Sequence, residues 1–162
     1  MSTNFFIRYK GSHDEGLHVA KRTGPSWWKF QGLYPSKRFI TTMGKYPKVY
    51  QCVEDFKDIL PKGIHAITSV SDWIYVLENL SDNAEFYSEN KDDEDEDTQE
   101  IISDWKNSTP QPIDAYCERL EKEMEQIARS GSDPIPQELI YSLREDEFVD
   151  SRGWLFSYRS FF

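Results

Sequence analysis

The stretch Asn4-Phe-Phe-Ile-Arg-Tyr-Lys10 is rich in residues that favour strands, and its end alternates apolar and polar side chains. A polar turn over Gly11–Gly16 follows it. Three further short segments of the same kind come next, separated by turns that contain Gly or Pro: Leu17–Lys21, Trp27–Gln31 and Arg38–Thr42. The N-terminal part therefore predicts an antiparallel β-meander.

Helical spacing replaces this pattern later in the chain. The segment Ser69–Leu80 places its apolar residues on one helical face, and Ser69 and Asp72 have the spacing of a capping box. Apolar residues at helical spacing predict three more helices: Tyr50–Leu60, a short helix capped by Asp97 or Thr98 with Ile101, Ile102 and Trp105 turned inward, and Ile113–Arg129. The later part is thus expected to be mainly helical.

Short strands are expected between and after these helices. Ile64–Ile67 and Ala84–Ser88 predict two strands, the second at a sheet edge, and Gln137–Leu143 predicts one helical turn. Phe148–Val149 and Trp154–Tyr158 predict a closing β-hairpin. We expect a single α+β domain over residues 1–162, in which the N-terminal meander packs with three or four helices.

Charge is divided very unevenly along the chain. The first 50 residues hold nine Lys and Arg against two acidic residues, a net charge of +7. Because the whole chain carries −10, residues 51–162 carry −17. A basic, aromatic, β-rich part is therefore followed by an acidic, helical part that includes an acidic loop at residues 90–97. Such asymmetry indicates polyanion partners or an acidic interaction surface.

Composition limits the class of protein. Aromatic residues make up 15% of the 162, which predicts a core built from Trp, Tyr and Phe. The two cysteines, Cys52 and Cys117, lie far apart and form no Cys-x-x-Cys pair, and the sequence has no signal peptide or long apolar run. We expect a soluble protein of a reducing cytoplasm, without membrane partners.

Several motifs together resemble a known family. The chain carries, in this order, Met1-Ser-Thr-Asn-Phe-Phe6, Leu17-His-Val-Ala-Lys-Arg-Thr23, Trp28-Lys-Phe30 and Phe148-Val-Asp-Ser-Arg-Gly-Trp-Leu-Phe-Ser157. These stretches resemble a widespread family of uncharacterised phage and prophage proteins that opens with Met-Gly-Thr-Asn-Tyr-Tyr and continues with Leu-His-Ile-Gly-Lys-Ser-Ser and Gly-Trp-x-Phe. Its Ser-Trp-x-x-Trp helix and acidic strand-turn with a second short helix are paralleled by Ser69–Leu80 and 86–106.

The resemblance implies an origin more than an activity. It implies that the chain is a small accessory protein of a virus that infects bacteria, and we expect it to work in the host cytoplasm. Many relatives carry a Cys-x-x-Cys pair where this chain has Gly11-Ser-His-Asp-Glu15, so no metal is carried over. Ala20 replaces a family Gly and Arg22-Thr23 replaces the Ser pair, which places any shared ligand pocket in question.

Our first functional hypothesis rests on acidic side chains. Six consecutive acids and one face of the Ile113–Arg129 helix are expected to supply the contacts: Asp92, Asp93, Glu94, Asp95, Glu96, Asp97, Glu118, Glu121 and Glu125. They could imitate a phosphate backbone and occupy a basic cleft on a host protein. We expect a protein without enzymatic activity, cofactor or metal that inhibits or redirects a host defence, protease or transcription complex. Ordinary solvated acids are the simpler interpretation.

A second hypothesis is nucleic-acid binding by the basic part. Cations and aromatic side chains alternate there as in surfaces that stack bases and bind phosphates. The residues concerned are His18, Lys21, Arg22, Trp27, Trp28, Lys29, Lys37 and Arg38. In alternating strands half of these aromatics face the core, and the lysines can instead meet the acidic helix of the same or another subunit of a homo-oligomer.

A third hypothesis places a nucleotide or phosphodiester near histidines. His65-Ala-Ile-Thr68 has an element used by two-histidine phosphoesterases, but His18-Val-Ala lacks the matching hydroxyl residue. A phosphate could also meet His18 beside Lys21, Arg22 and Thr23. The pair His13 and His18 is five residues apart rather than the four that a helical zinc-peptidase motif requires, so we expect a polar turn there.

Overall fold

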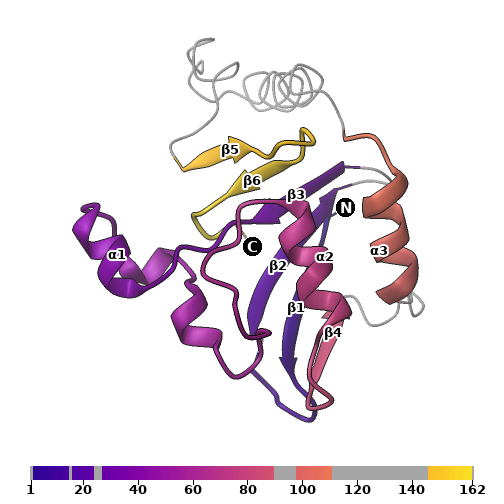
Figure 1. Cartoon of the computed structure of the whole chain (residues 1–162), viewed down its shortest axis with the longest axis horizontal. Helices are drawn as coiled ribbons and strands as arrows, with labels where there is room; N and C mark the ends of the chain where they lie inside the picture. Colours follow the sequence, from indigo (N-terminus) through magenta and orange to yellow (C-terminus); the bar gives the residue numbers. More distant parts are fainter. Residues whose placement is uncertain (1, 15, 24–26, 90–97, 111–145, 162) are drawn as a thin grey trace, which may run out of the picture.

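The computed structural model describes residues 2–14, 16–23, 27–89, 98–110 and 146–161. Six strands form one mixed sheet in the order β4-β1-β2-β3-β6-β5 (Figure 1). Their bounds are β1 Ser2–Tyr9, β2 Leu17–Thr23, β3 Trp27–Gln31, β4 Ala84–Ser88, β5 Glu147–Val149 and β6 Leu155–Ser157. The predicted α+β class, the N-terminal meander β1–β3 and the C-terminal hairpin β5–β6 are confirmed.

An aromatic row runs across the sheet. Phe5 lies opposite Ala20, Ala20 opposite Phe30, Phe30 opposite Phe156, and Phe156 opposite Phe148. The strands β3 and β6 are parallel, whereas the other neighbours are antiparallel. Because paired residues share a face, this register places one continuous apolar surface on one side of the sheet.

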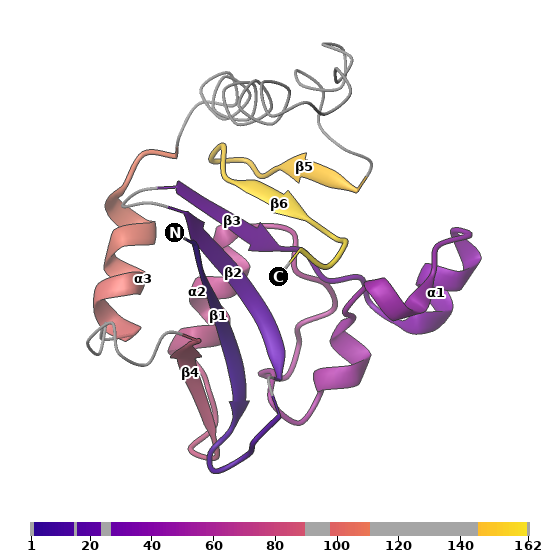
Figure 2. The same cartoon turned by 180° about the vertical axis from the view of Figure 1, so that it is seen from behind.

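Two helices cover that apolar surface. Figures 1 and 2 show α2 (Val70–Glu78) and α3 (Thr98–Asn107) on the same face of the sheet. The predicted capping box is present, with Ser69 and Asp72 bonded reciprocally at the start of α2. Trp73 is fully buried and its Nε1–H donates to the Gln31 carbonyl oxygen at 2.8 Å. Trp105 sits edge-on to Phe30, with ring centroids 5.0 Å apart.

The expected fourth strand at Arg38–Thr42 is wrong, because this segment is the helix α1 (Lys37–Thr42). Ser36 caps it, since its Oγ accepts from the Phe39 N–H at 3.1 Å. The helix ends before Gly44, whose φ of 75° is in the left-handed region. Strand-favouring composition was therefore overridden by the cap and by the terminal glycine.

The predicted Tyr50–Leu60 helix is also wrong in extent. Within this segment the structure has only the short 3₁₀ turn η2 (Val53–Phe56), and another such turn, η1 (Pro47–Val49), precedes the segment. The residues between them are extended, because Tyr50 bridges to Arg159 and Cys52 bridges to Tyr34. The predicted strand Ile64–Ile67 reduces to one bridge between Leu33 and Ile67.

Other predictions lie outside the described residues. These are the acidic loop at 90–97, the helix at 113–129 and the helical turn at 137–143. The strand β4 is at the sheet edge as expected, and α3 buries Ile101, Ile102 and Trp105 as expected. None of the helices in the described ranges has both the length and the apolar character needed to cross a bilayer.

Candidate functional site

The sheet face opposite α2 and α3 carries a buried polar network centred on His18. This side chain is fully buried. Its Nδ1 lies 3.0 Å from Gln31 Oε1 and its Nε2 lies 3.0 Å from Asn4 Oδ1. The side chain of Gln51 bonds the backbone of His18 as a paired strand would. Its Oε1 accepts from the His18 N–H, and its Nε2 donates to the His18 carbonyl oxygen. His18 is therefore part of the fold's internal polar structure.

Burial controls the protonation of His18. Loss of hydration lowers its pKa from 6.5 to about 4, although the Gln31 contact favours the charged form. The imidazole ring is edge-on to Phe161, with ring centroids 4.8 Å apart. A neutral, enclosed imidazole cannot meet an external phosphate, so His18 does not contribute a cation to a surface site.

The other basic and aromatic candidates of β2 and β3 are also engaged within the fold. Lys29 Nζ lies 2.8 Å from Glu147 Oε2, and this glutamate side chain is only 6% exposed. The Arg22 guanidinium lies 5.4 Å from the ring centroids of Phe5 and Trp28. Trp28 itself packs on the core and is half-buried. Lys21 and Trp27 are half-buried as well.

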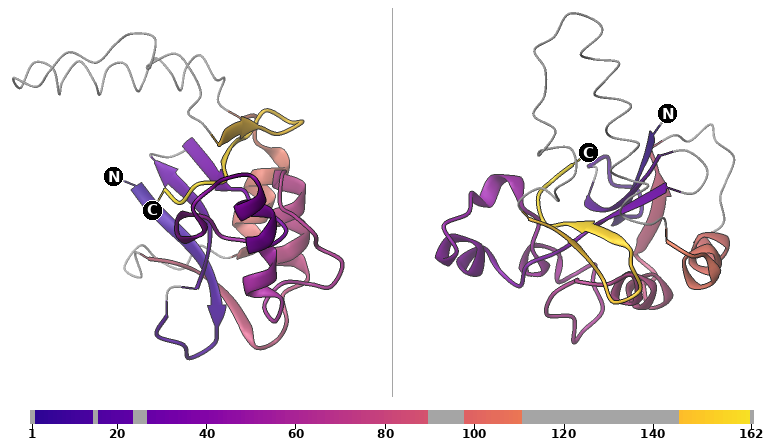
Figure 3. Two further views of the ribbon diagram at one scale, coloured as in Figure 1. Left: turned by 90° about the vertical axis from the view of Figure 1, so that its left-hand side faces the viewer. Right: turned by 90° about the horizontal axis from the view of Figure 1, so that it is seen from above.

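A different surface is exposed in residues 36–50, which comprise α1, η1 and their flanks. We call it the basic aromatic knob. It lies at the end of the molecule away from α3 (Figures 1 and 3). Three large apolar side chains are exposed there, Phe39 at 45%, Met43 at 44% and Tyr46 at 67%. The segment contains four basic residues and no acidic one: Lys37, Arg38, Lys45 and Lys48.

The knob is attached to the body by the buried Ile40 side chain, by ion pairs of Lys37 and Lys45, and by contacts of Tyr50. Ile40 is fully buried beside Tyr34 and Cys52. Lys45 Nζ lies 3.0 Å from Asp146 Oδ1, and the other oxygen of this carboxylate accepts from the Tyr50 hydroxyl at 2.6 Å. At the start of α1, Lys37 Nζ lies 3.3 Å from Asp55 Oδ1. These contacts fix the position of the knob while its aromatic tip stays exposed.

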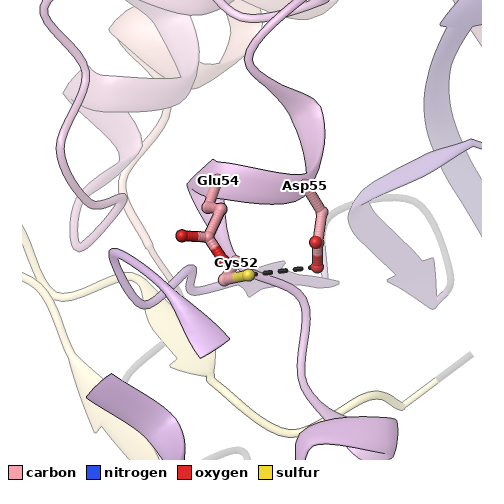
Figure 4. Close-up of side chains that lie close together, drawn as sticks. All are labelled: Cys52, Glu54 and Asp55. Atoms are coloured by element: carbon pink, nitrogen blue, oxygen red, sulfur yellow. Dashed lines mark hydrogen bonds between the residues drawn. The ribbon is translucent and has the colours of Figure 1, made fainter. Parts of the chain in front are cut away.

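Beneath this attachment, Cys52, Glu54 and Asp55 bring one thiol and two carboxylates within 4.8 Å of one another (Figure 4). The Cys52 thiol donates to Asp55 Oδ2 at 3.0 Å, and burial first and Asp55 second raise its pKa to about 11. Glu54 accepts from the Lys37 backbone N–H at 3.4 Å. A metal would have to displace both the thiol proton and Lys37, so this cluster serves to hold α1 on η2.

The remaining candidates are distributed as follows. Asp92–Asp97 and Glu118, Glu121 and Glu125 lie outside the described residues. His13 and His65 are exposed in separate connecting segments, whereas His18 is enclosed. Arg38 is exposed on the knob, so of the predicted basic residues only it and Lys37 lie there.

Sequence reasoning missed the polar partners Asn4, Gln31 and Gln51, and the exposure of Met43. Asn4 and Gln31 belong to strands, so strand alternation could have placed them on the face opposite the aromatic row. For His18 a β-bulge interrupts the alternation of faces. Consecutive residues of β1, Phe5 and Phe6, lie opposite Ala20 and His18, so Val19 is passed over in the pairing. No sequence pattern indicates the Gln51 contact, which joins distant segments.

Comparison of the chain with protein-family models, with curated protein sequences and with solved structures gave no match.

Proposed function

We propose that the chain is a non-enzymatic binding protein that docks its basic aromatic knob onto an acidic, partly apolar surface of another protein. The exposure of Phe39, Met43 and Tyr46 beside basic residues supports this proposal more than any other observation. Tyr, Phe, Met and Arg are enriched in protein interfaces, and exposed apolar side chains grouped on one surface are typical of contact sites. The phage resemblance suggests the setting, in which the partner is a host complex that is inhibited or redirected.

The charge of the knob determines the kind of partner. Lys37 and Lys45 are already paired with Asp55 and Asp146. Arg38 and Lys48 are exposed, and in the described part of the chain neither forms an ion pair. Two cations around an apolar tip suit a rim of acidic side chains that excludes solvent from a central contact. Nucleic-acid binding through so few cations would give a log-log salt slope of about 2 at most on duplex DNA.

The acidic segments form the second part of the proposal. Asp92–Asp97 and Glu118, Glu121 and Glu125 would steer the chain towards a basic region of the same host complex. Steering of this kind acts mainly on the association rate and weakens with salt. The two surfaces would thus have separate roles, with apolar contact at the knob and electrostatic attraction at the acidic segments.

The test is affinity capture from host-cell extract, with nuclease treatment and with matched variants. The double variant Phe39→Ser/Tyr46→Ser should lower retention of the captured protein at least about tenfold, a loss of about 1.4 kcal/mol. Tyr75→Ser is the control, because Tyr75 is 48% exposed on α2, away from the knob. Equal retention by the double variant and the control contradicts the proposal.

Two further outcomes separate the alternatives. If nuclease removes all retention and the salt slope exceeds about 2, DNA binding by the basic part replaces protein binding. If replacing Asp92–Asp97 by their amides leaves the association rate and its salt dependence unchanged, the electrostatic role of the acidic segment is wrong.

A further inference from the structure

A concave site lies apart from the aromatic tip of the knob, where β1 turns into β2. It has a volume of about 310 Å³, at the lower end of the range for small-molecule pockets. The turn from β1 and the segment around η2 form its walls. The side chains that decide its chemistry are Tyr9, Asp14, Asp55, Phe56, Asp58 and Ile59. In Figure 1 the β1–β2 turn is at the lower edge of the sheet.

The shape of the turn depends on Gly16. Its φ is 83°, in the left-handed region that favours glycine, and a Cβ at this position would collide with the Ile7 carbonyl oxygen. The turn is therefore held tightly against the end of β1. This close approach places Ser12 and Asp14 on the wall opposite η2.

The lining is negatively charged. Among the described residues of the lining, Asp14, Asp55 and Asp58 contribute carboxylates. Arg8 is the one basic residue in the described part of the lining. Its guanidinium is directed to other groups: Nε donates to Glu85 at 2.8 Å, and the guanidinium carbon lies 3.8 Å from the Tyr87 ring centroid. Asp55 keeps its ion pair with Lys37, so Asp14 and Asp58 provide the charge that a ligand would meet.

The same cavity has an apolar wall. Ile59 is 6% exposed and Phe56 is half-buried, and both pack against the main core. Burial first, and then the charge of Asp58 and a hydrogen bond to it, raise the pKa of Tyr9, so its phenol stays protonated beside this carboxylate. A cavity that combines carboxylates with an aliphatic and aromatic wall matches a cation carried on a short hydrocarbon stem.

We propose that this cavity binds a primary alkylammonium group, with the ammonium at Asp14 and Asp58 and the methylene stem along Phe56 and Ile59. Free aliphatic diamines and the lysine side chain of another protein share this chemistry. The site is distinct from the exposed tip of the knob, so its function goes beyond the proposed function and does not depend on it. A partner lysine would make it a second contact point, and a diamine would make it a small-molecule site.

The experiment is an NMR titration of the isotope-labelled full chain with putrescine, followed by the same titration of variants. Putrescine should shift the amides of residues 8–16 and 55–59 in a saturable manner. Asp58→Asn and Asp14→Asn should each weaken putrescine binding about tenfold, because each removes one carboxylate. Asp82→Asn is the matched control, an exposed aspartate in the turn before β4 that is not part of the cavity.

Neutral and peptide probes complete the test. 1-Butanol, which keeps the stem but lacks the charge, should not saturate the site, whereas butylamine should. Tighter binding of N-acetyl-lysine methylamide than of putrescine supports the proposal with a protein lysine as the source, and the reverse order supports it with a free diamine. The proposal is overturned if putrescine shifts are not confined to the cavity, or if both aspartate variants, folded by circular dichroism, bind like the wild type. The Phe39→Ser/Tyr46→Ser variant should bind putrescine normally, so the two proposals fail independently.

Discussion

Two regions of the basic N-terminal part have similar composition but differ in the exposure of their side chains. In β2 and β3 the cations and aromatic rings are used by the fold: Lys29 pairs with Glu147, Arg22 lies beside aromatic rings, and Trp28 packs on the core. In the knob, Phe39, Met43 and Tyr46 are exposed. The cause is burial: β2 and β3 are inner strands that bury Ala20 and Phe30 on one face and His18 and Gln31 on the other. In contrast, α1 buries only Ile40.

This contrast shows what a basic aromatic composition can and cannot indicate. In this chain the interleaved rings are exposed in the knob, where the backbone has left the sheet, and are buried or half-buried in β2 and β3. In a central strand, successive side chains point to opposite faces of the sheet. In β2 and β3 the side chains of both faces make their contacts within the fold. Of these two regions, only the knob exposes several rings beside cations, so our proposal of a contact surface concerns residues 36–50 alone.

The largest expected difference is in the free energy of unfolding, when one aromatic ring is removed from each region. Trp28→Ala removes contacts with Phe5, Phe30 and Trp105, whose ring centroids lie 5.2, 6.0 and 5.3 Å away. It should lower the free energy of unfolding by about 3 kcal/mol, as for other large aromatic truncations. Tyr46→Ala should change it by no more than about 0.5 kcal/mol. Urea unfolding measures both, and similar losses would mean that the two regions do not differ.

The next effect concerns pH and His18. An unfolded histidine binds a proton near pH 6.5, whereas the folded one does so only near pH 4. Between these values the unfolded state binds more protons, so the free energy of unfolding falls as pH falls, by about 3 kcal/mol in total. His18→Gln should remove this part of the pH dependence. Unfolding curves of both proteins from pH 7 to pH 4 test it, and parallel curves would contradict the enclosed, neutral His18.

A smaller difference in stability is expected between a lysine that is paired within the fold and a lysine that is exposed on the knob. Lys29→Met removes a cation from beside Glu147, a side chain that is only 6% exposed, and should cost about 2 kcal/mol of stability. Lys48→Met is the matched change on the knob, where the ammonium is exposed, and should cost less than about 0.5 kcal/mol. Thermal unfolding at low and high salt measures both. Equal costs would show that Lys48 is also part of the fold.

The sequence predicted those elements whose local signals agree with their packing. The period of Ser69–Leu80 and its capping box specify α2, and the apolar spacing around Ile101, Ile102 and Trp105 specifies α3. The strands β1 to β3 follow from composition and turns. The alternation of Lys29 and Phe30 between opposite sheet faces also follows from the two-residue period of strands.

Other features depend on contacts between distant residues that leave no local pattern. The Gln51 amide holds the backbone of His18, and the Tyr50–Arg159 bridge keeps the start of the predicted Tyr50–Leu60 helix extended. The cavity beside η2 joins the β1–β2 turn to residues 55–59, which are far apart in the chain. Such sites require tertiary structure, because their residues have no common spacing.

The helix α1 is the intermediate case, because its β-branched residues favour a strand whereas Ser36 and Gly44 supply the signals of a helix start and a helix end. Ser36 supplies the cap of α1 as Ser69 does for α2. Ser36→Ala should cost about 1 kcal/mol, but locally: amides of α1 should exchange with solvent about fivefold faster while those of β2 and β3 keep their rates.

The matched change Ser69→Ala acts on a helix with five buried residues, so it should lower the global free energy of unfolding by a similar amount. Hydrogen exchange and urea unfolding of the two variants separate these outcomes. If Ser36→Ala destabilises the whole protein as Ser69→Ala does, then the knob is an integral part of the core. If it loosens α1 alone and also weakens partner capture, then the binding surface depends on a helix that the rest of the fold does not require.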